Sequence, residues 1–351
     1  MATERQPVGV GLTGFARGPA SPAAAVMPRP SPMELAALGK IRDLLSGLRL
    51  AILTGAGLST DSGIPDYRGP GSVPRSPMTY QEFVGDEALR RRYWARNHLG
   101  WRHLRRADPN AGHFAVAELE HRGLTTGIIT QNVDRLHQAA GALGVVDLHG
   151  RFDRVICLNC HTRFSRGHIA ERLEELNRGF VELVEADGSI ESAPDADAIL
   201  EQETHIARFR IAPCEVCGGM LKPDFVFFGE NVPKDRVERS YAILDEAQAL
   251  LVAGSSLTVM SGLRFPRHAA KTGKPVVIIN RGATRGDGLA TMKLEAGVSE
   301  SLAYLAGSLP AGRSAADGDG GVGGGGGGSV DVEGRAAGGG GGSVDGGVRG
   351  S

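Results

Sequence analysis

The stretch Leu50-Ala51-Ile52-Leu53-Thr54-Gly55-Ala56-Gly57 joins a short apolar run to a Gly-x-Gly pattern. The run predicts a buried strand, and the glycines predict a turn in which backbone N–H groups can approach a pyrophosphate beside a helix N-terminus. An ordinary strand-to-helix turn explains the same residues. The third glycine and the downstream acidic residue of the usual dehydrogenase fingerprint do not appear here.

Similar apolar runs recur along the chain and indicate the fold class. They are rich in Val, Ile and Leu and lie at residues 50–53, 124–130, 250–253 and 275–280, with helical patterns at 33–46 and 234–248. Buried parallel strands with crossover helices are the natural interpretation of this alternation. The sequence therefore predicts an α/β fold, a Rossmann-like parallel sheet domain with a smaller zinc-binding module formed by insertions.

The composition of the two ends predicts one folded domain between disordered arms. Residues 1–31 carry Pro, Ala and Gly without apolar periodicity, and residues 311–351 are dominated by glycine runs; such segments cannot form a core. The folded domain is predicted over residues 32–310. Within it we expect a core from about 33–70, 123–151 and 222–308, a helical insertion at about 71–122, and a zinc module at about 152–221.

The four cysteines form two C-x2-C pairs, Cys157/Cys160 and Cys214/Cys217. Four thiolates at this spacing can close a tetrahedral shell around one Zn²⁺, and no cysteine is then left for a nucleophile. A closed shell indicates a structural metal. Free thiols or two disulfides are the alternative, but each pair is too close in sequence for an easy bridge.

The charge balance bounds the partners. A net charge of −1 predicts no strongly basic surface and therefore no nucleic-acid partner. Arginines at 90–92, 102, 105 and 106 fit a solvated helix face, with a polyanion site as the alternative. The apolar patch at 23–27 is too short for a membrane span, so we expect a cytoplasmic protein without a membrane partner. Thirty-three Arg against six Lys favours a GC-rich, bacterial source.

Further blocks of sequence follow the glycine turn in a fixed order. They are Gly55-Ala56-Gly57-Leu58-Ser59 with Gly63-Ile64-Pro65-Asp66-Tyr67-Arg68, Gln131-Asn132-Val133-Asp134-Arg135-Leu136-His137, Leu148-His149-Gly150, the two cysteine pairs, Lys222-Pro223-Asp224-Phe225-Val226-Phe227-Phe228-Gly229-Glu230, and Gly254-Ser255-Ser256. In order and spacing these blocks resemble the sirtuin family over about residues 33–305. Arg92-Tyr93-Trp94-Ala95-Arg96-Asn97 and the long insert between the cysteine pairs look most like the class II branch, which includes mitochondrial sirtuin four.

Sirtuins are NAD-dependent protein lysine deacylases. The resemblance therefore implies NAD as co-substrate, one structural Zn²⁺, and acylated lysine side chains of proteins as partners. It implies that Gly55, Ala56 and Gly57 cradle phosphate through backbone amides. The other NAD contacts that it implies are Asp66, Tyr67 and Arg68 at the nicotinamide ribose, Gln131, Asn132, Val133 and Asp134 at the ribose and carboxamide, Gly254, Ser255 and Ser256 at phosphate and ribose, Asn280, Arg281 and Gly282 at the adenosine, and Val298 at the adenine.

The resemblance also implies that His149 is the catalytic base, with Asn132 and Asp134 beside it. In the sirtuin scheme the acyl oxygen attacks C1′ of the nicotinamide ribose, nicotinamide leaves, and the histidine takes a proton from the ribose hydroxyl that closes onto the O-alkylimidate. An imidazole with a pKa near working pH suits this task. The alternatives are a structural histidine at a strand end and, for Asn132 and Asp134, caps at a strand-to-helix junction.

Two further groups are expected to contact the substrate. Residues 226–230 are apolar and predicted to be extended, and the family pairs this segment with the substrate backbone, here through Val226, Phe227, Phe228 and Gly229. Core packing explains Phe227 and Phe228 equally well. Tyr93 and Arg96 share a helix face at i, i+3 and resemble the Tyr-x-x-Arg by which another sirtuin branch selects acidic acyl groups. An aromatic core residue beside a surface arginine is the alternative.

Functions from other classes are weighed against deacylation. A nicotinamide dehydrogenase would need a catalytic metal or acid, and four committed cysteines leave no open zinc position. A module that only binds NAD or ADP-ribose would not need Asn132, Asp134 and His149 together. Protein mono-ADP-ribosyl transfer uses the same nicotinamide-displacing half-reaction and is the principal alternative.

Overall fold

A computed structural model of the chain describes residues 29–69, 77–187 and 203–310. The predicted disorder of the two arms concerns residues that lie almost entirely outside these ranges. The first described helix, α1 (Pro32–Leu45), begins after Ser31, whose hydroxyl caps Glu34 N–H while the Glu34 carboxylate accepts from Ser31 N–H. This reciprocal cap, with proline at the first helical position, explains why the helix starts here.

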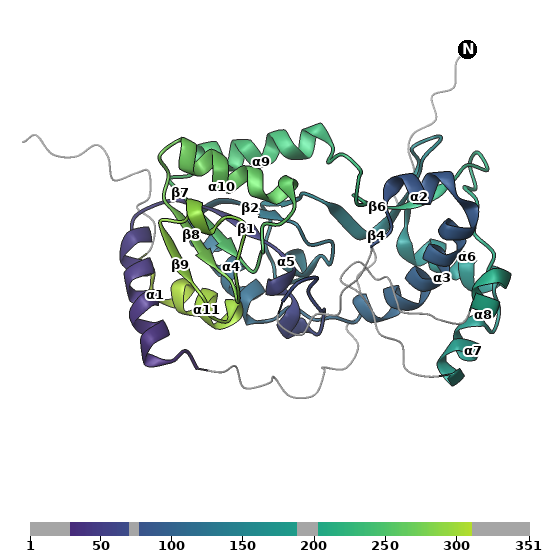
Figure 1. Ribbon diagram of the computed structural model, residues 1–351, viewed down its shortest axis with the longest axis horizontal. Coiled ribbons are helices and arrows are strands. Elements are labelled where there is room, and N and C mark those ends of the chain that lie inside the picture. Colours follow the sequence, from purple (N-terminus) through teal and green to yellow (C-terminus); the bar gives the residue numbers. More distant parts are fainter. Residues whose placement is uncertain (1–28, 70–76, 188–202, 311–351) are drawn as a thin grey trace, which may run out of the picture. The chain divides into compact units, whose positions relative to one another are not determined.

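The centre of the larger module is a six-stranded parallel sheet in the order β3-β2-β1-β7-β8-β9 (Figure 1). Its strands are β1 (Leu50–Thr54), β2 (Thr125–Thr130), β3 (Val145–Asp147), β7 (Ala249–Ala253), β8 (Val276–Ile279) and β9 (Met292–Leu294). The four runs predicted as strands are all in this sheet. The short edge strands β3 and β9 were not predicted, because three residues do not make a recognisable apolar run.

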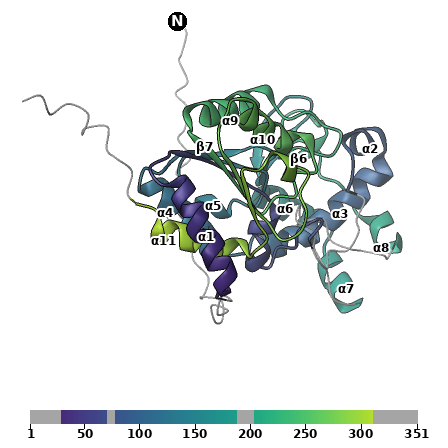
Figure 2. The same cartoon turned by 60° about the vertical axis from the view of Figure 1, so that its left-hand side comes forward.

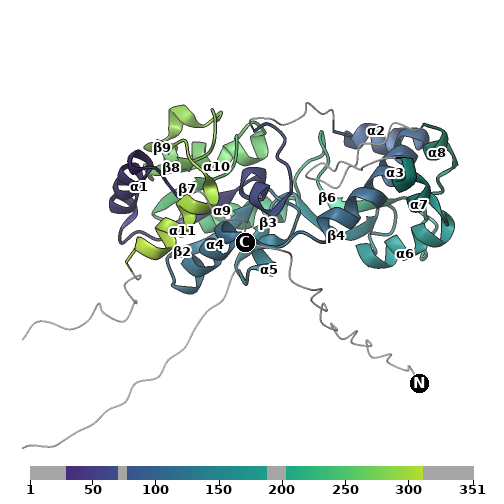
Figure 3. The ribbon, with the colours of Figure 1, turned by 90° about the horizontal axis from the view of Figure 1, so that it is seen from below.

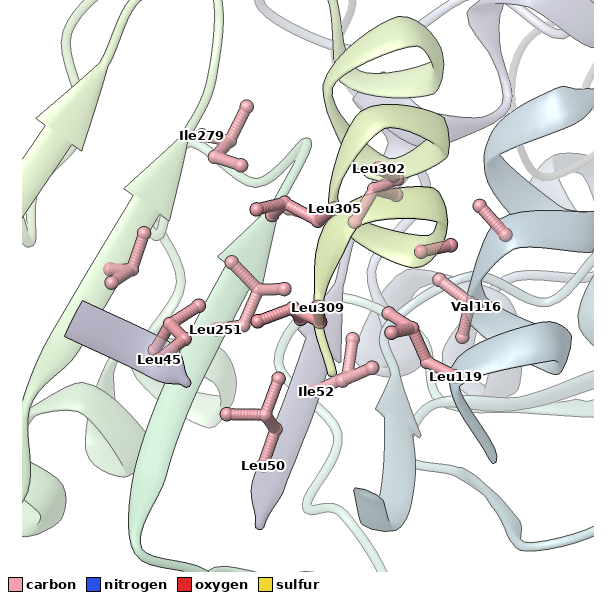
Figure 4. Packing of buried hydrophobic residues seen from close by; sticks show 14 of the residues in the cluster. Leu45, Leu50, Ile52, Val116, Leu119, Leu251, Ile279, Leu302, Leu305 and Leu309 are labelled. Atoms are coloured by element: carbon pink, nitrogen blue, oxygen red, sulfur yellow. The ribbon is translucent and has the colours of Figure 1, made fainter. Parts of the chain in front are cut away.

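Alternate residues of each strand face two helical layers, as the pleat of a strand requires. Leu50 and Ile52 pack with α1, with α4 (Ala111–His121) and with α11 (Val298–Ser308), and Figure 4 shows this cluster. Ala51 and Leu53 face the other side, where α9 (Lys234–Glu246) and α10 (Met260–Lys271) cover the sheet (Figure 2). The sheet is therefore buried on both faces, as expected for parallel strands.

A smaller module surrounds an antiparallel sheet in the order β5-β4-β6, seen from below in Figure 3. Its elements are α2 (Tyr80–Gly85), α3 (Glu87–Leu104), β4 (Gly150–Cys157), β5 (Arg163–Ser165), α6 (Arg166–Leu176), α7 (Phe180–Asp187), α8 (Glu203–Arg208) and β6 (Leu221–Phe225). Phe83, Trp94, Val155, Leu173 and Leu221 belong to its common core. The helices α2 and α3 thus share a core with the segment that carries the cysteines.

One helix differs from the predicted grouping. Residues 71–122 were expected to form a single helical insertion, but α4 packs in the large module through Val116 and Leu119. Its apolar face matches α11 and the sheet rather than α2 and α3. In the described part of the chain, no helix is long and apolar enough to cross a membrane.

Candidate active site

A cleft of about 660 Å³ lies at the carboxyl ends of β1, β2, β7 and β8. The turns after these strands bring Gly55, Gln131, Gly254 and Asn280 to its wall. Parallel strands present their carboxyl ends at one edge of the sheet, which is where open α/β sheets bind ligands. The wall is completed by His149, which directly precedes β4, by residues 225–232 at and after the end of β6, and by Met78 and Tyr93.

Two glycine turns meet inside this cleft. The N–H of Gly57 donates to the Gly254 carbonyl oxygen at 2.9 Å, and the N–H of Gly55 donates to the Ala253 carbonyl oxygen at 3.2 Å. Gly254 has φ +67°, and a side-chain carbon there would lie 2.4 Å from the Leu58 nitrogen. The glycines are therefore required by backbone contact between the two turns.

This geometry corrects one detail of the expected phosphate cradle. Three free backbone amides were expected at Gly55, Ala56 and Gly57, but those of Gly55 and Gly57 already donate to backbone carbonyls. Ala56 is the first residue of a 3₁₀ turn, Ala56–Leu58, where N–H groups lack intrahelical acceptors. Both turns line the cleft, the second through Gly254, Ser255 and Ser256, so an anionic ligand in the cleft can reach the backbone of either turn.

Polar side chains after β2 connect this strand to its neighbours. The Gln131 amide donates to Ser255 Oγ at 2.7 Å, and the Asn132 amide donates to the Gly55 carbonyl oxygen and to Ser59 Oγ, both at 3.0 Å. Ser59 in turn donates to Asp134 Oδ2 at 2.7 Å. Asn132, Asp134 and Ser59 are buried, so the network fixes these groups against the cleft.

Asp134 also contacts the start of the next helix. Its Oδ1 accepts from Leu136 N–H at 2.9 Å, at the entrance to α5 (Leu136–Ala139). Burial raises the pKa of Asp134, while the hydrogen bonds from Leu136 and Ser59 oppose this shift. Asp134 thus holds the first N–H of α5 from outside the helix, whose N-cap is Arg135, and it lines the cleft with Asn132 and Val133.

His149 lies between β3 and β4 and lines the cleft. Each of its ring nitrogens has a hydrogen-bond partner. Nδ1 is 3.0 Å from the Gln131 carbonyl oxygen, and Nε2 is 2.8 Å from Ser261 Oγ. Burial lowers its pKa to about 4. This pKa is lower than the value near working pH that was expected, because desolvation disfavours the charged ring. The ring is therefore neutral near pH 7, the form that a general base requires.

The end of the cleft beside β8 contains Asn280, Arg281 and Gly282. The Asn280 amide donates to the Arg281 and Gly282 carbonyl oxygens at 2.9 and 3.2 Å, which closes the turn after β8. Arg281 is exposed, and its guanidinium approaches Glu300 at 3.5 Å. Val298 begins α11, is buried in the large core, and is not among the residues that line the cleft.

Asp66, Tyr67 and Arg68 lie in the loop after the first glycine turn and line the cleft. Asp66 Oδ1 accepts from Gly69 N–H at 2.7 Å, and the Tyr67 ring meets the Phe228 ring edge-on at 6.2 Å. This loop therefore contacts the segment that was expected to bind the substrate.

The segment 226–230 was predicted to be extended, but only its first part is. Val226 N–H donates to the His149 carbonyl oxygen, but the Glu230 N–H returns to the Phe227 carbonyl oxygen at 3.0 Å and closes a turn. The Glu230 carboxylate holds this turn, because it accepts from Phe227 N–H at 2.8 Å and from buried Lys222 Nζ at 3.1 Å. Val226, Phe227, Phe228 and Gly229 all line the cleft.

The proposed acyl-selecting pair is divided between two environments. Tyr93 is buried, lines the cleft and packs against Phe83 and Phe227 with ring centroids 5.4 and 5.0 Å apart. Its hydroxyl accepts a long hydrogen bond, 3.4 Å, from the Asn97 amide. Arg96 lies on the same helix but is not among the lining residues. The core alternative accounts for the Tyr93 ring, and the same residue lines the wall of the cleft.

Several residues on the wall of the cleft were not predicted from the sequence. Ser59 was not predicted to line the site, although a hydroxyl group so close to a glycine turn is a recognisable polar signal. Ser261 and Arg264 line the cleft from the first turns of α10. Ser261 is separated from His149 by 112 residues, so no local pattern could have paired them.

The four cysteine sulfurs lie within 4.8 Å of one another. The distance between Cys157 Sγ and Cys217 Sγ is 3.6 Å, and between Cys160 Sγ and Cys214 Sγ it is 3.7 Å. A tetrahedral shell with Zn–S bonds of about 2.3 Å has sulfurs about 3.8 Å apart. All four are free thiols, so the disulfide alternative is wrong. The ligand set and spacing fit one closed structural zinc site.

Comparisons with known proteins agree with this geometry. A profile described as the Sir2 family matches residues 55–261. The NAD-dependent protein deacetylase 1 of Mycobacterium avium (strain 104) is 59% identical over 266 residues, which cover 76% of this chain and 93% of that protein. The protein of the same name from Streptomyces coelicolor (strain ATCC BAA-471 / A3(2) / M145) is 54% identical over 274 residues, 78% of this chain and 90% of that protein. A solved Sir2 structure with a p53 peptide and NAD⁺ superposes with a TM-score of 0.62 at 30% identity, covering 76% of this chain and 96% of that one.

Proposed function

This chain belongs to the Sir2 family and is an NAD-dependent protein deacylase, and we propose that His149 is the catalytic base of its cleft. NAD is its co-substrate, and acylated lysine side chains of proteins are its substrates. The class II branch stays a prediction.

The observation that supports this role most directly is that the neutral His149 ring is held by two hydrogen bonds on the wall of the cleft. A backbone carbonyl can only accept, so Nδ1 carries the proton toward Gln131 and Nε2 keeps its lone pair. Nε2 can then accept a proton from a ribose hydroxyl of the co-substrate. Asn132 and Asp134 support this base through the buried network that they form with Ser59.

The residues that would hold NAD follow the strand ends. When bound, NAD supplies the ribose carbon that receives the acyl oxygen as nicotinamide leaves. We assign the phosphates to the two glycine turns and the adenosine ribose to Asn280, where a polar side chain ends β8. Gln131 and Asn132 orient the nicotinamide end, with residues 66–68 beside them. Val298 would contribute only through its backbone, since its side chain belongs to the core.

The choice of acyl group is assigned to residues 226–229 and Tyr93, which line the cleft. Val226, Phe227, Phe228 and Gly229 would contact the substrate, and Tyr93 offers its hydroxyl beside Phe227. We propose that Tyr93 favours binding of an acidic acyl group over acetyl. Arg96, on the same helix α3, would add positive charge near that group. A hydroxyl that donates to a carboxylate makes a charge-assisted hydrogen bond.

The cysteine cluster suits one Zn²⁺ that stabilises the small module, and reduced thiols suit a reducing compartment. We therefore propose that the protein acts in the cytoplasm. The domain is proposed to extend from about residue 32 to 310.

The test is mass spectrometry of the protein with NAD and acetyl-, succinyl-, glutaryl-, hydroxymethylglutaryl- and lipoyl-lysine peptides. Loss of the acyl group, with nicotinamide and O-acyl-ADP-ribose in equal amounts, is expected, and the unacylated peptide is the control. Nicotinamide release with an ADP-ribosylated peptide would instead establish mono-ADP-ribosyl transfer. Unchanged NAD with every peptide would contradict the proposal.

A further inference from the structure

The Nε2 atom of His149 has a partner that the family motifs did not indicate. Ser261 Oγ lies 2.8 Å from Nε2, while Nδ1 is 3.0 Å from the Gln131 carbonyl oxygen. Because Nδ1 carries the ring proton, the serine hydroxyl must donate to Nε2. Within the described residues, His149 is the hydrogen-bond partner recorded for the Ser261 hydroxyl.

The fold holds this serine against the cleft. Ser261 is the second residue of α10, which follows β7 and the turn at Gly254. The next residue, Gly262, lets the helix approach the end of β2, because a side-chain carbon there would lie 2.4 Å from Gln131 Oε1. Gln131 therefore contacts α10 with its side chain and His149 with its carbonyl group. One residue thus ties the helix and the imidazole together.

We propose that Ser261 is a positioning residue for His149. This inference rests on the proposed function, in which Nε2 takes a proton from a ribose hydroxyl. An imidazole held at both nitrogens cannot turn its ring away from the cleft. Neutral Nε2 has one lone pair, so the Ser261 O–H that donates to it rotates away as the ribose hydroxyl takes its place. The serine oxygen then accepts from Nε2–H after the ribose proton has moved there. The electron pair left on the ribose oxygen then forms the bond to the acyl carbon, as the π pair of the imidate C=N bond moves onto nitrogen.

The experiment compares two rates of the full-length protein with NAD and an acetyl-lysine peptide. Exchange of labelled nicotinamide into NAD reports the step before His149 acts, and O-acetyl-ADP-ribose formation reports the complete reaction. Ser261→Ala is expected to slow product formation roughly tenfold, the effect of one hydrogen bond. Exchange and the KM for NAD should stay within about twofold of wild type. Ser261→Thr, which keeps the hydroxyl, should restore product formation.

Lys271→Ala is the matched control, because Lys271 is exposed at the other end of the same helix. Product formation by Ser261→Ala within twofold of wild type would overturn the inference. An equal loss of both rates that Ser261→Thr does not restore would also overturn it, because that result indicates a structural role. If Ser261→Ala does not fold, Ser261→Cys, a weaker donor of similar shape, replaces it with the same expectations. A wild-type protein that performs neither reaction would refute the proposed function instead.

Discussion

The backbone N–H of Gly57 donates to the carbonyl oxygen of Gly254 at 2.9 Å, although the two residues follow different strands. This hydrogen bond joins the turns after β1 and β7, and both glycines line the cleft. A side chain on either glycine would enter the backbone of the other turn. The two turns therefore have to be treated as one structural unit.

Gly254→Ala is expected to destabilise the fold and abolish NAD binding. Its added carbon would meet the Leu58 nitrogen at 2.4 Å in a backbone with φ +67°. Gly273→Ala is the matched control, since Gly273 has φ +71° and no atom within 4 Å of an added carbon. The control should lose only the left-handed penalty of about 1–2 kcal/mol. Urea denaturation and calorimetric NAD titration measure both, and equal losses for the two variants would contradict the clash.

Zinc removal is expected to unfold the small module first. Both tryptophans of the chain, Trp94 and Trp101, lie on α3, and the Arg166 guanidinium lies over both rings. Their fluorescence therefore reports on this module. One Zn²⁺ per chain is expected by elemental analysis, and a chelator should shift the emission to the red, because closed thiolate sites contribute roughly 10 kcal/mol or more to folding. Added zinc should reverse the shift. Unchanged emission after complete zinc loss would refute the structural role.

The fold is expected to lose stability as the pH falls below about 6.5. Burial lowers the pKa of His98 to about 3 and those of His137 and His149 to about 4. The unfolded chain, with histidine pKa values near 6.5, therefore binds protons first. Each such histidine lowers the free energy of unfolding by about 1.4 kcal/mol at pH 5.5, relative to high pH.

Denaturant unfolding at pH 7.5 and 5.5 measures this dependence. His137→Gln should reduce the difference between the two pH values by about 1.4 kcal/mol, whereas His103→Gln, at an exposed position, should leave it unchanged. An equal pH dependence in wild type and His137→Gln would argue against a neutral buried imidazole at that position.

Tyr93→Phe is expected to lower the preference for succinyl-lysine over acetyl-lysine by roughly tenfold, because one charge-assisted hydrogen bond is lost. The ring contacts with Phe83 and Phe227 remain in this variant, so the fold should be preserved. The ratio of the two kcat/KM values is the measurement. An unchanged ratio would assign Tyr93 to the aromatic core alone.

The sequence predicted those parts of the molecule that depend on local patterns. The strand at 50–53 and the glycines after it are adjacent in the chain, so their relation can be read directly. Two hydrogen bonds join segments that are far apart in the sequence. One links Ser261 to His149, and the other links the Gly57 N–H to the Gly254 carbonyl oxygen. Pairing of that kind depends on how α10 and β7 pack, which no local pattern records.

The small module was the harder part to predict. Strand β4 alternates irregularly between buried and exposed residues and contains a break in its register with β6. The turn at 226–230 depends on an ion pair between buried Lys222 and half-buried Glu230, which an apolar pattern does not reveal. Only the cysteine spacing gave this module a clear signal, because metal ligation restricts both residue type and distance.

The most direct test of the central claim is mass spectrometry of an acyl-lysine peptide incubated with NAD and either wild type or His149→Ala. With wild type, the peptide should lose its acyl group as an equal amount of O-acyl-ADP-ribose forms. His149→Ala, with its zinc content and melting temperature unchanged, should slow this product by at least about 100-fold. Product formation at the wild-type rate by His149→Ala, or an acyl group lost without O-acyl-ADP-ribose, would contradict the account.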